Sequence, residues 1–168
     1  MKVIRLLFLL LYLLFVPAWN EEDTLDETFN DAVDYCIIVL KRIIKKYAAT
    51  VAARSMVKQS MENSNTHKTG ILILGKYIPW ISTACTEENC KFCIFPGIRG
   101  GYNVQAVPVQ AGSRENRIPF PDDWRGLQGM EADIKCPGMT FCHQAGFLAA
   151  FNTLEEAIGA AKALIDNT

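Results

Sequence analysis

The sequence contains few of the residues that metal-dependent hydrolases use. Only two histidines occur in its 168 residues, His67 and His143, and neither has another histidine two, three or four positions further on. There is no H-E-x-x-H, no paired D-x-D and no Asp-His-His run. A catalytic metal needs several imidazoles and carboxylates that converge on one ion. The sequence therefore predicts no metal site and no catalytic residue within this chain.

Other catalytic and targeting motifs are also absent. The chain has no P-loop, no G-x-G-x-x-G fingerprint and no G-x-S-x-G elbow, so it lacks the usual signatures of nucleotide-binding and serine-hydrolase folds. It has no N-x-[ST] acceptor, which is weak evidence against a long secretory history. The composition is typical of a globular protein, and the missing motifs predict a non-catalytic module.

The net charge is small, and the charged residues are unevenly distributed along the chain. The net charge is −1, which predicts no polyanionic partner. Seven acids and no base lie in residues 21–34, whereas six bases and no acid lie in residues 35–61. Such a basic stripe can bind a phosphate backbone. We favour the simpler interpretation, in which one long helix carries acids near its start and bases further along, in accord with the helix dipole.

The first residues form a hydrophobic segment. Lys2 and Arg5 precede an apolar run from Leu6 to Val16, which is shorter than the roughly 20 residues of a membrane span. Residues 1–18 therefore look like a secretory signal with a cleavage site at Val16-Pro17-Ala18. In a secretory setting, the six cysteines would be able to form disulfides.

The cysteines allow a weaker metal hypothesis. Cys85, Cys90 and Cys93 have C-x4-C-x2-C spacing, found in one type of iron–sulfur loop, with Cys136 or Cys142 as a possible fourth ligand. However, Cys93 lies in a predicted strand, where it is expected to point inward as a small hydrophobic residue. Cys142 and His143 are adjacent in another predicted strand, so they point to opposite faces and make a poor nucleophile–base pair.

The order of predicted elements indicates an α+β fold. Apolar residues at spacings of three and four predict a helix of about six turns from Leu25 to Tyr47, continuing helically to Met61 after a bend. Thr153 and Glu156 form a capping box for a C-terminal helix. We expect an antiparallel sheet packed against the N-terminal long helices and the C-terminal helix, in a single domain over residues 19–168. Five strand-like runs supply the sheet: Ile71–Leu74, Lys91–Phe95, Tyr102–Val109, Met139–His143 and Phe147–Phe151.

The C-terminal part of the sequence resembles a known family. Residues 117–127 (RIPFPDDWRGL) and 141–147 (FCHQAGF), followed by Thr153 and Glu155, are similar to the MYG exonuclease family, which is related to the DHH phosphoesterases. The resemblance covers roughly Pro17 to the end. It implies a metal-dependent 3′–5′ RNA exonuclease that is cytoplasmic, nuclear or mitochondrial. The family's N-terminal catalytic domain, with its His- and Asp-rich metal motifs, has no counterpart in this sequence.

The resemblance implies a substrate-binding lobe whose catalytic partner is missing. It would be inactive by itself and would need no cofactor of its own. Its expected partners are RNA or a nucleotide phosphate, and a catalytic lobe in trans. His143 would contact the phosphate or stabilise developing charge, with the alternative that it only forms a hydrogen bond within the hairpin. Arg117 and Arg125 would help to hold the substrate's backbone. The hairpin after His143, which contains Gly146, would bring backbone N–H groups and the N-terminus of the last helix close to the anion. Trp124 is a candidate base-stacking residue, but a loop anchor is the favoured interpretation, and Arg125 is equally expected to pin the proline-rich loop to Asp122 or Asp123.

The sequence departs from the family at several positions. Ala149 and Ala150 stand where glycine is usual, Glu156 replaces another glycine, and a few residues between Gly129 and Pro137 are missing. These changes fit relaxed selection on a non-catalytic fragment or a changed substrate. The resemblance also favours residues 1–16 being a by-product of gene truncation. The alternative is a secreted or membrane-tethered α+β binding module, with membrane contact only if residues 1–18 act as a signal.

Overall fold

The computed structural model describes Phe15 and residues 25–168. The predicted signal-like segment therefore lies outside the described residues, apart from Phe15. The chain divides into two compact units, residues 1–49 and Thr50–Thr168, so the expected single domain over 19–168 stays a prediction. Within the described residues, no helix has the length and apolarity needed to cross a bilayer.

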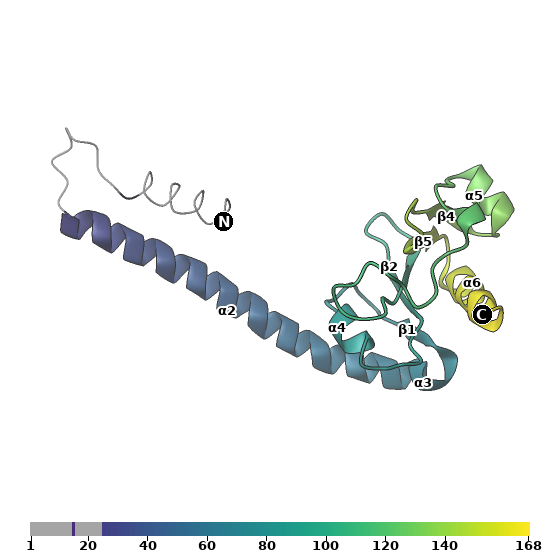
Figure 1. Cartoon of the computed structure of the whole chain (residues 1–168), viewed down its shortest axis with the longest axis horizontal. Helices are drawn as coiled ribbons and strands as arrows, with labels where there is room; N and C mark the ends of the chain where they lie inside the picture. The colour runs from purple at the N-terminus through teal and green to yellow at the C-terminus, as the bar shows by residue number, and fades with distance from the viewer. Residues whose placement is uncertain (1–14, 16–24) are drawn as a thin grey trace. The chain divides into compact units, whose positions relative to one another are not determined.

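The predicted long helix is a single helix, α2 (Leu25–Asn63), of 39 residues (Figure 1). Its first turn carries Asp26 and Glu27, which suits the positive end of the helix dipole. In the first unit its apolar residues are largely exposed, with Phe29 at 66% and Leu40 at 56%. From Ala53 and Val57 onward the helix enters the core of the second unit.

The second unit contains a five-stranded sheet in the order β1-β2-β3-β5-β4. All five predicted strands are present: β1 Ile71–Ile73, β2 Phe92–Pro96, β3 Tyr102–Ala106, β4 Met139–Cys142 and β5 Leu148–Phe151. Four are shorter than predicted, and β2 is shifted by one residue. The α+β fold is confirmed, but the sheet is mixed and not purely antiparallel, because β1 pairs with β2 in parallel. The long connection between them, which contains α4 (Ile81–Ala84), returns the chain to the same end of the sheet.

Short helical turns connect these elements. α3 (Thr66–Thr69) ends at Gly70, whose φ of 72° suits glycine. In the proline-rich segment, η1 (Asp122–Trp124) is a 3-10 turn and α5 (Met130–Lys135) is a helix that the sequence pattern did not predict. α6 (Leu154–Asp166) is the predicted C-terminal helix.

Two cores occupy the two faces of the sheet. On one face, α6 packs over the strands, and Ala157, Ala160 and Ala161 meet residues such as Phe92 and Phe151. On the other face, a second cluster contains Val57 of α2, Trp80, and Cys93 and Phe95 of β2. This second cluster includes residues of β1 and β2 but none of β3, β4 or β5. The last three strands therefore keep one face without a covering helix among the described elements.

Candidate functional site

The uncovered part of the sheet is the candidate site, which we call the open face. Side chains alternate between the two faces of a strand. In β3, Val104 and Ala106 are buried on the α6 side, so Asn103 and Gln105 lie on the open face and are only partly buried. Strand pairing extends this face across β5 and β4. Its residues are Asn103, Gln105, Phe141, His143, Leu148 and Ala150.

Two hollows lie along this face. The larger, about 680 Å³, lies beside the glycine-rich β2–β3 loop and is lined by Arg99, Asn103, Phe141 and Asn152 among others. The smaller, about 430 Å³, is lined by Gln105, Arg114, Asn116 and Phe147 among others. None of the described residues that line either hollow is acidic. The open face therefore offers an arginine, amide side chains and an aromatic ring at each of two places.

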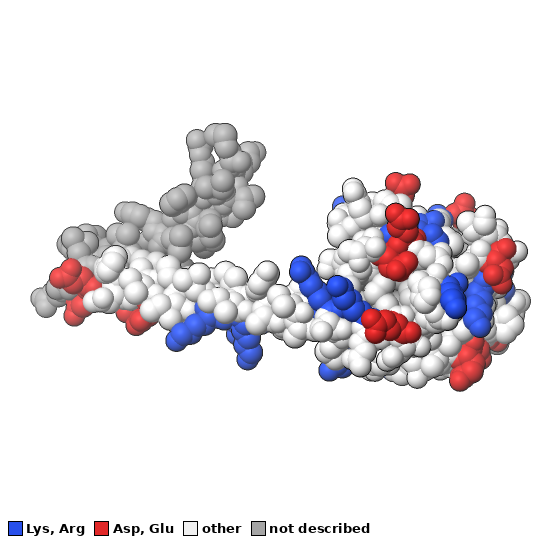
Figure 2. All heavy atoms as spheres, turned by 90° about the horizontal axis from the view of Figure 1, so that it is seen from below, with Lys and Arg blue, Asp and Glu red and all other residues white. Residues whose placement is uncertain are grey.

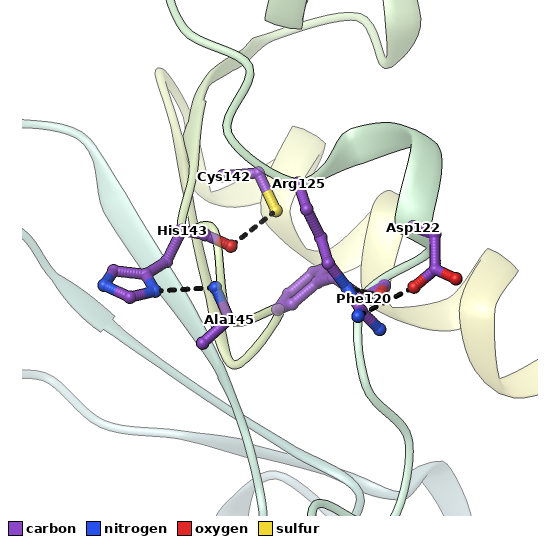
Figure 3. A network of polar contacts seen from close by, with 6 residues as sticks. All are labelled: Phe120, Asp122, Arg125, Cys142, His143 and Ala145. Carbon is purple, nitrogen blue, oxygen red and sulfur yellow. Dashed lines mark hydrogen bonds and ion pairs between the residues drawn. The ribbon is translucent and has the colours of Figure 1, made fainter.

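His143 lies on the open face between two phenylalanines. Its ring centroid is 4.4 Å from that of Phe147 and 6.3 Å from that of Phe141. The backbone N–H of Ala145 donates to His143 Nδ1 at 3.0 Å (Figure 3). Because Nδ1 accepts this bond, the proton of the neutral ring resides on Nε2. His143 is therefore held in one orientation and can donate from Nε2 to an anion.

Arg125 lies on the other side of the β4–β5 turn. Its Nε donates to the Phe120 carbonyl at 3.1 Å, and its guanidinium pairs with Asp122 at 2.7 Å. Figure 3 shows the imidazole of His143 and the guanidinium of Arg125 pointing away from each other. The predicted pinning of the proline-rich loop by Arg125 is confirmed. The structure does not bring Arg125 and His143 together at one site.

Gly146 lies in the β4–β5 turn, where it contacts both His143 and the Arg125 side chain. It has a φ of 64°, and a Cβ at this position would collide with the Arg125 side chain. Its carbonyl accepts from the Phe120 N–H at 2.9 Å, and its own N–H donates to the His143 carbonyl at 2.8 Å. The glycine is therefore required both by the turn and by the close approach of Arg125.

Arg117 points toward a different part of the molecule. Its guanidinium donates to the carbonyls of Cys85, Glu87, Glu88 and Cys90 at 2.5–3.1 Å. These bonds hold the turn that leads into β2. The four hydrogen bonds of the Arg117 guanidinium therefore all go to backbone carbonyls.

Trp124 is an anchor for the proline-rich loop. Its ring stacks on Phe120 at a centroid distance of 6.1 Å and an interplanar angle of 30°. Phe120 is fully buried, and Trp124 packs against the same core. The favoured interpretation of Trp124 as a loop anchor is confirmed.

The expected position of the last helix was wrong. The sequence interpretation brought the N-terminus of α6 close to His143. In the structure, Met139 pairs with Phe151, so the start of α6 lies near Gly138, at the opposite end of the β4–β5 hairpin from His143. The capping box itself is confirmed: Thr153 N–H donates to Glu156 Oε2 at 2.9 Å, and Glu156 N–H donates to Thr153 Oγ1 at 3.3 Å. The Glu156 carboxylate caps its own helix and is distant in the fold from the His143 turn.

The cysteines are free thiols in buried or partly buried positions, except for the exposed Cys36. Burial raises the pKa of Cys90 to about 12 and that of Cys142 to about 11, and it holds the pKa of Cys93 well above its usual range. Cys93 is fully buried in β2, as predicted for a small hydrophobic residue. Within the described part of the chain, no three His, Cys, Asp or Glu side chains are grouped closely enough to hold a metal ion.

Several residues of the open face and its two hollows were not selected from the sequence as site residues. The fold places Arg99 and Asn103 at the larger hollow. It places Gln105, Arg114 and Phe147 at the smaller one. A signal was available in β3, where Asn103 and Gln105 alternate with Val104 and Ala106, a pattern typical of a strand with one solvated face.

The α+β fold with a mixed sheet is a class of domain that many unrelated proteins share. Comparison with known proteins is more specific. The sequence matches the model MYG1_exonuc, described as an uncharacterised protein family (UPF0160), over residues 13–165. The chain therefore belongs to the MYG1 family.

Relatives in distant organisms support this assignment. The chain is 36% identical to the mouse MYG1 exonuclease and 34% identical to the human one, over 89% of its own length and 43% of theirs. It is 28% identical to the fission yeast MYG1 protein C694.04c, over 90% of this chain and 50% of that protein. The chain thus spans about half the length of the curated relatives it matches. No solved structure matches it significantly.

Proposed function

We propose that this chain supplies the substrate-binding half of a MYG-type metal-dependent phosphoesterase that acts on RNA, and that it is inactive alone. The support is its family membership together with its coverage of about half of each relative. Two of those relatives are named as exonucleases. A divalent metal would be needed only for catalysis by a half that this sequence does not contain.

The open face is the proposed contact surface for single-stranded RNA. Unpaired bases stack on aromatic side chains, and this stacking tolerates any sequence because every base has a π-face. Phe141, His143 and Phe147 present three such rings within the β4–β5 hairpin. Arg99 and Arg114 are exposed at the two hollows, where each can meet a phosphate. The observation that carries the proposal is this combination of neighbouring aromatic rings and arginines on an uncovered sheet.

His143 is the proposed central contact. Its Nδ1 is fixed by the Ala145 N–H, so Nε2–H is the atom that would donate to a phosphate oxygen. Gly146 gives the turn its shape and allows Arg125 to pack beneath it. In this proposal Arg125, Trp124 and Arg117 are positioning residues: the first two hold the proline-rich loop and the third holds the turn before β2.

Fluorescence anisotropy with a labelled oligouridylate of about ten nucleotides tests the proposal on the full chain. We expect His143→Ala and Phe147→Ala each to weaken binding by about tenfold, because each removes a ring. A plot of the logarithm of the binding constant against the logarithm of the salt concentration measures the phosphate contacts. Arg99→Ala and Arg114→Ala should each reduce the slope of this plot by about one. Incubation of the same RNA with Mn²⁺ and the chain should leave it uncut.

Two variants are matched controls. His67→Ala removes the other histidine, which lies in α3, and Lys162→Ala removes a positive charge from α6, on the opposite face of the sheet. Both should bind RNA like the unaltered chain. Equal losses in the controls and in the open-face variants would contradict the binding site, whereas metal-dependent cleavage by the chain alone would contradict its inactivity.

A further inference from the structure

The first unit presents an apolar row on α2. Val33, Ile37, Leu40, Ile44 and Tyr47 follow alternating steps of four and three residues, which is the spacing of a coiled-coil seam. All five are exposed, from 38% for Val33 to 67% for Tyr47. The rings of Phe15 and Tyr35, whose centroids are 5.6 Å apart, meet on the other side of the helix from this row.

Two further rows flank the seam. Cys36 and Ile43, seven residues apart, border it on one side. Asp34 and Lys41, also seven residues apart, border it on the other. Figure 2 shows that the acidic side chains lie near the start of α2 and the basic ones further along it. The polar border of the seam thus changes sign along the helix.

We propose that α2 pairs with α2 of a second copy of this chain in an antiparallel, two-fold symmetric coiled coil. A two-fold axis midway between Ile37 and Leu40 places Ile37 against the partner's Leu40 and Val33 against the partner's Ile44. The same axis places Asp34 beside the partner's Lys41, and the partner's Asp34 beside Lys41. Each flanking charge is therefore matched twice by symmetry.

The other rows agree with this register. Cys36 falls beside the partner's Ile43, so the second border is apolar throughout. Asn30, one heptad before Ile37, falls opposite the partner's Tyr47, whose hydroxyl can pair with the amide. A polar pair at one layer fixes the register of a coiled coil.

A parallel pair of α2 helices would not bring Asp34 beside the partner's Lys41. It would align the acidic start of α2 with the acidic start of its partner. It would also place Asp34 and Lys41 beside the apolar row that contains Cys36. Charge complementarity therefore selects both a second copy as the occupant of the seam and the antiparallel direction.

Sedimentation equilibrium of the full chain under reducing conditions tests the pairing. We expect a species of about twice 18.8 kDa. Leu40→Asp should shift it to a monomer, because Leu40 lies in the seam. Ile38→Asp is the matched control, since Ile38 is equally exposed, at 64%, but faces away from the seam. A monomeric unaltered chain, or equal effects of the two variants, would overturn the proposal.

A charge swap tests the direction of pairing. Asp34→Lys and Lys41→Asp should each weaken the dimer by about tenfold, and the double variant should return to within about threefold of the unaltered chain. Within one helix these residues are roughly 10 Å apart, so the rescue requires two chains. Each single change also creates a favourable charge pair inside its own helix: Asp34→Lys with Asp31, and Lys41→Asp with Lys45. A weaker dimer in the single variants would therefore not be due to loss of the helix. No rescue in the double variant would overturn the antiparallel arrangement.

Discussion

Arg117 and Arg125 each use their guanidinium to hold part of this chain's own backbone. They lie in the same sequence motif, but they hold different segments. Arg117 donates to four carbonyls in the segment from Cys85 to Cys90. Arg125 donates to the Phe120 carbonyl and pairs with Asp122. The planar guanidinium suits this task because its several N–H groups diverge in fixed directions. His143 differs, because only its Nδ1 is engaged by the fold.

Removing the Arg117 guanidinium should destabilise the second unit. Arg117→Met keeps much of the side chain's apolar length but leaves the carbonyls of Cys85 and Cys90 without the donor that the fold gives them. We expect a loss of about 2–3 kcal/mol in the free energy of unfolding, measured by urea titration with tryptophan fluorescence. Arg54→Met, at an exposed position on α2, should stay within about 0.5 kcal/mol. Equal stability of the two variants would contradict a structural role for Arg117.

At the scale of elements, the β4–β5 hairpin and α6 form one locally determined unit. The hairpin turn contains His143 and Gly146, and the strand that follows leads directly into the capping box of α6. Gly138 has a φ of 82°, and a Cβ there would collide with the Glu156 carboxylate. The cap and the hairpin are therefore packed against each other.

Loss of the helix cap should have a measurable cost. Thr153→Ala removes the oxygen that accepts from the Glu156 N–H, so we expect about 1 kcal/mol lower stability in thermal or urea unfolding. Thr168→Ala is a suitable comparison, since Thr168 is the last residue and is exposed. Its effect should be close to zero. A Thr153→Ala variant as stable as Thr168→Ala would show that the cap contributes nothing.

At the scale of the whole molecule, thiols are distributed through both cores of the second unit. Cys142 belongs to the core beneath α6, whereas Cys90 and Cys93 belong to the core beneath α2 and α4. Burial favours the neutral thiol, and so raises the pKa of each group. The folded chain therefore keeps these protons at a pH where the unfolded chain has lost them.

This difference predicts alkaline sensitivity. Below the pKa of an unfolded cysteine, about 8.5, the thiols are neutral in both states and stability is fully present. Above it, the unfolded chain loses protons first, so the free energy of unfolding falls as pH rises toward the folded values of about 11 for Cys142 and 12 for Cys90. The slope should reach about 1.4 kcal/mol per pH unit for each thiol.

Urea unfolding between pH 8 and about 10.5, with reductant present, measures the slope. Cys142→Ala should make it shallower, because one thiol no longer titrates differently in the two states. Cys36→Ser is the control, since Cys36 is exposed on α2. An unchanged slope in Cys142→Ala would contradict a buried neutral thiol at that position.

Local pattern was sufficient for much of the fold. The capping box, the five strand-like runs and the long apolar helix were all predicted, since each depends on residues close together in sequence. The pinning of the loop by Arg125 and the anchoring by Trp124 were among the interpretations weighed, because the partners Asp122 and Phe120 are only a few residues away. Family membership also followed from sequence motifs alone.

Only the tertiary structure decided the direction of β1, the position of the α6 N-terminus and the members of the open face. Each depends on which strands become neighbours, and β1 and β2 are separated by a long connection that no local pattern constrains. Asn103 lies far in sequence from the hairpin that carries Phe141 and Phe147, and the pairing of β3, β5 and β4 places them on one surface. The sequence by itself determined the elements and the family, whereas the packing of the sheet determined which side chains meet.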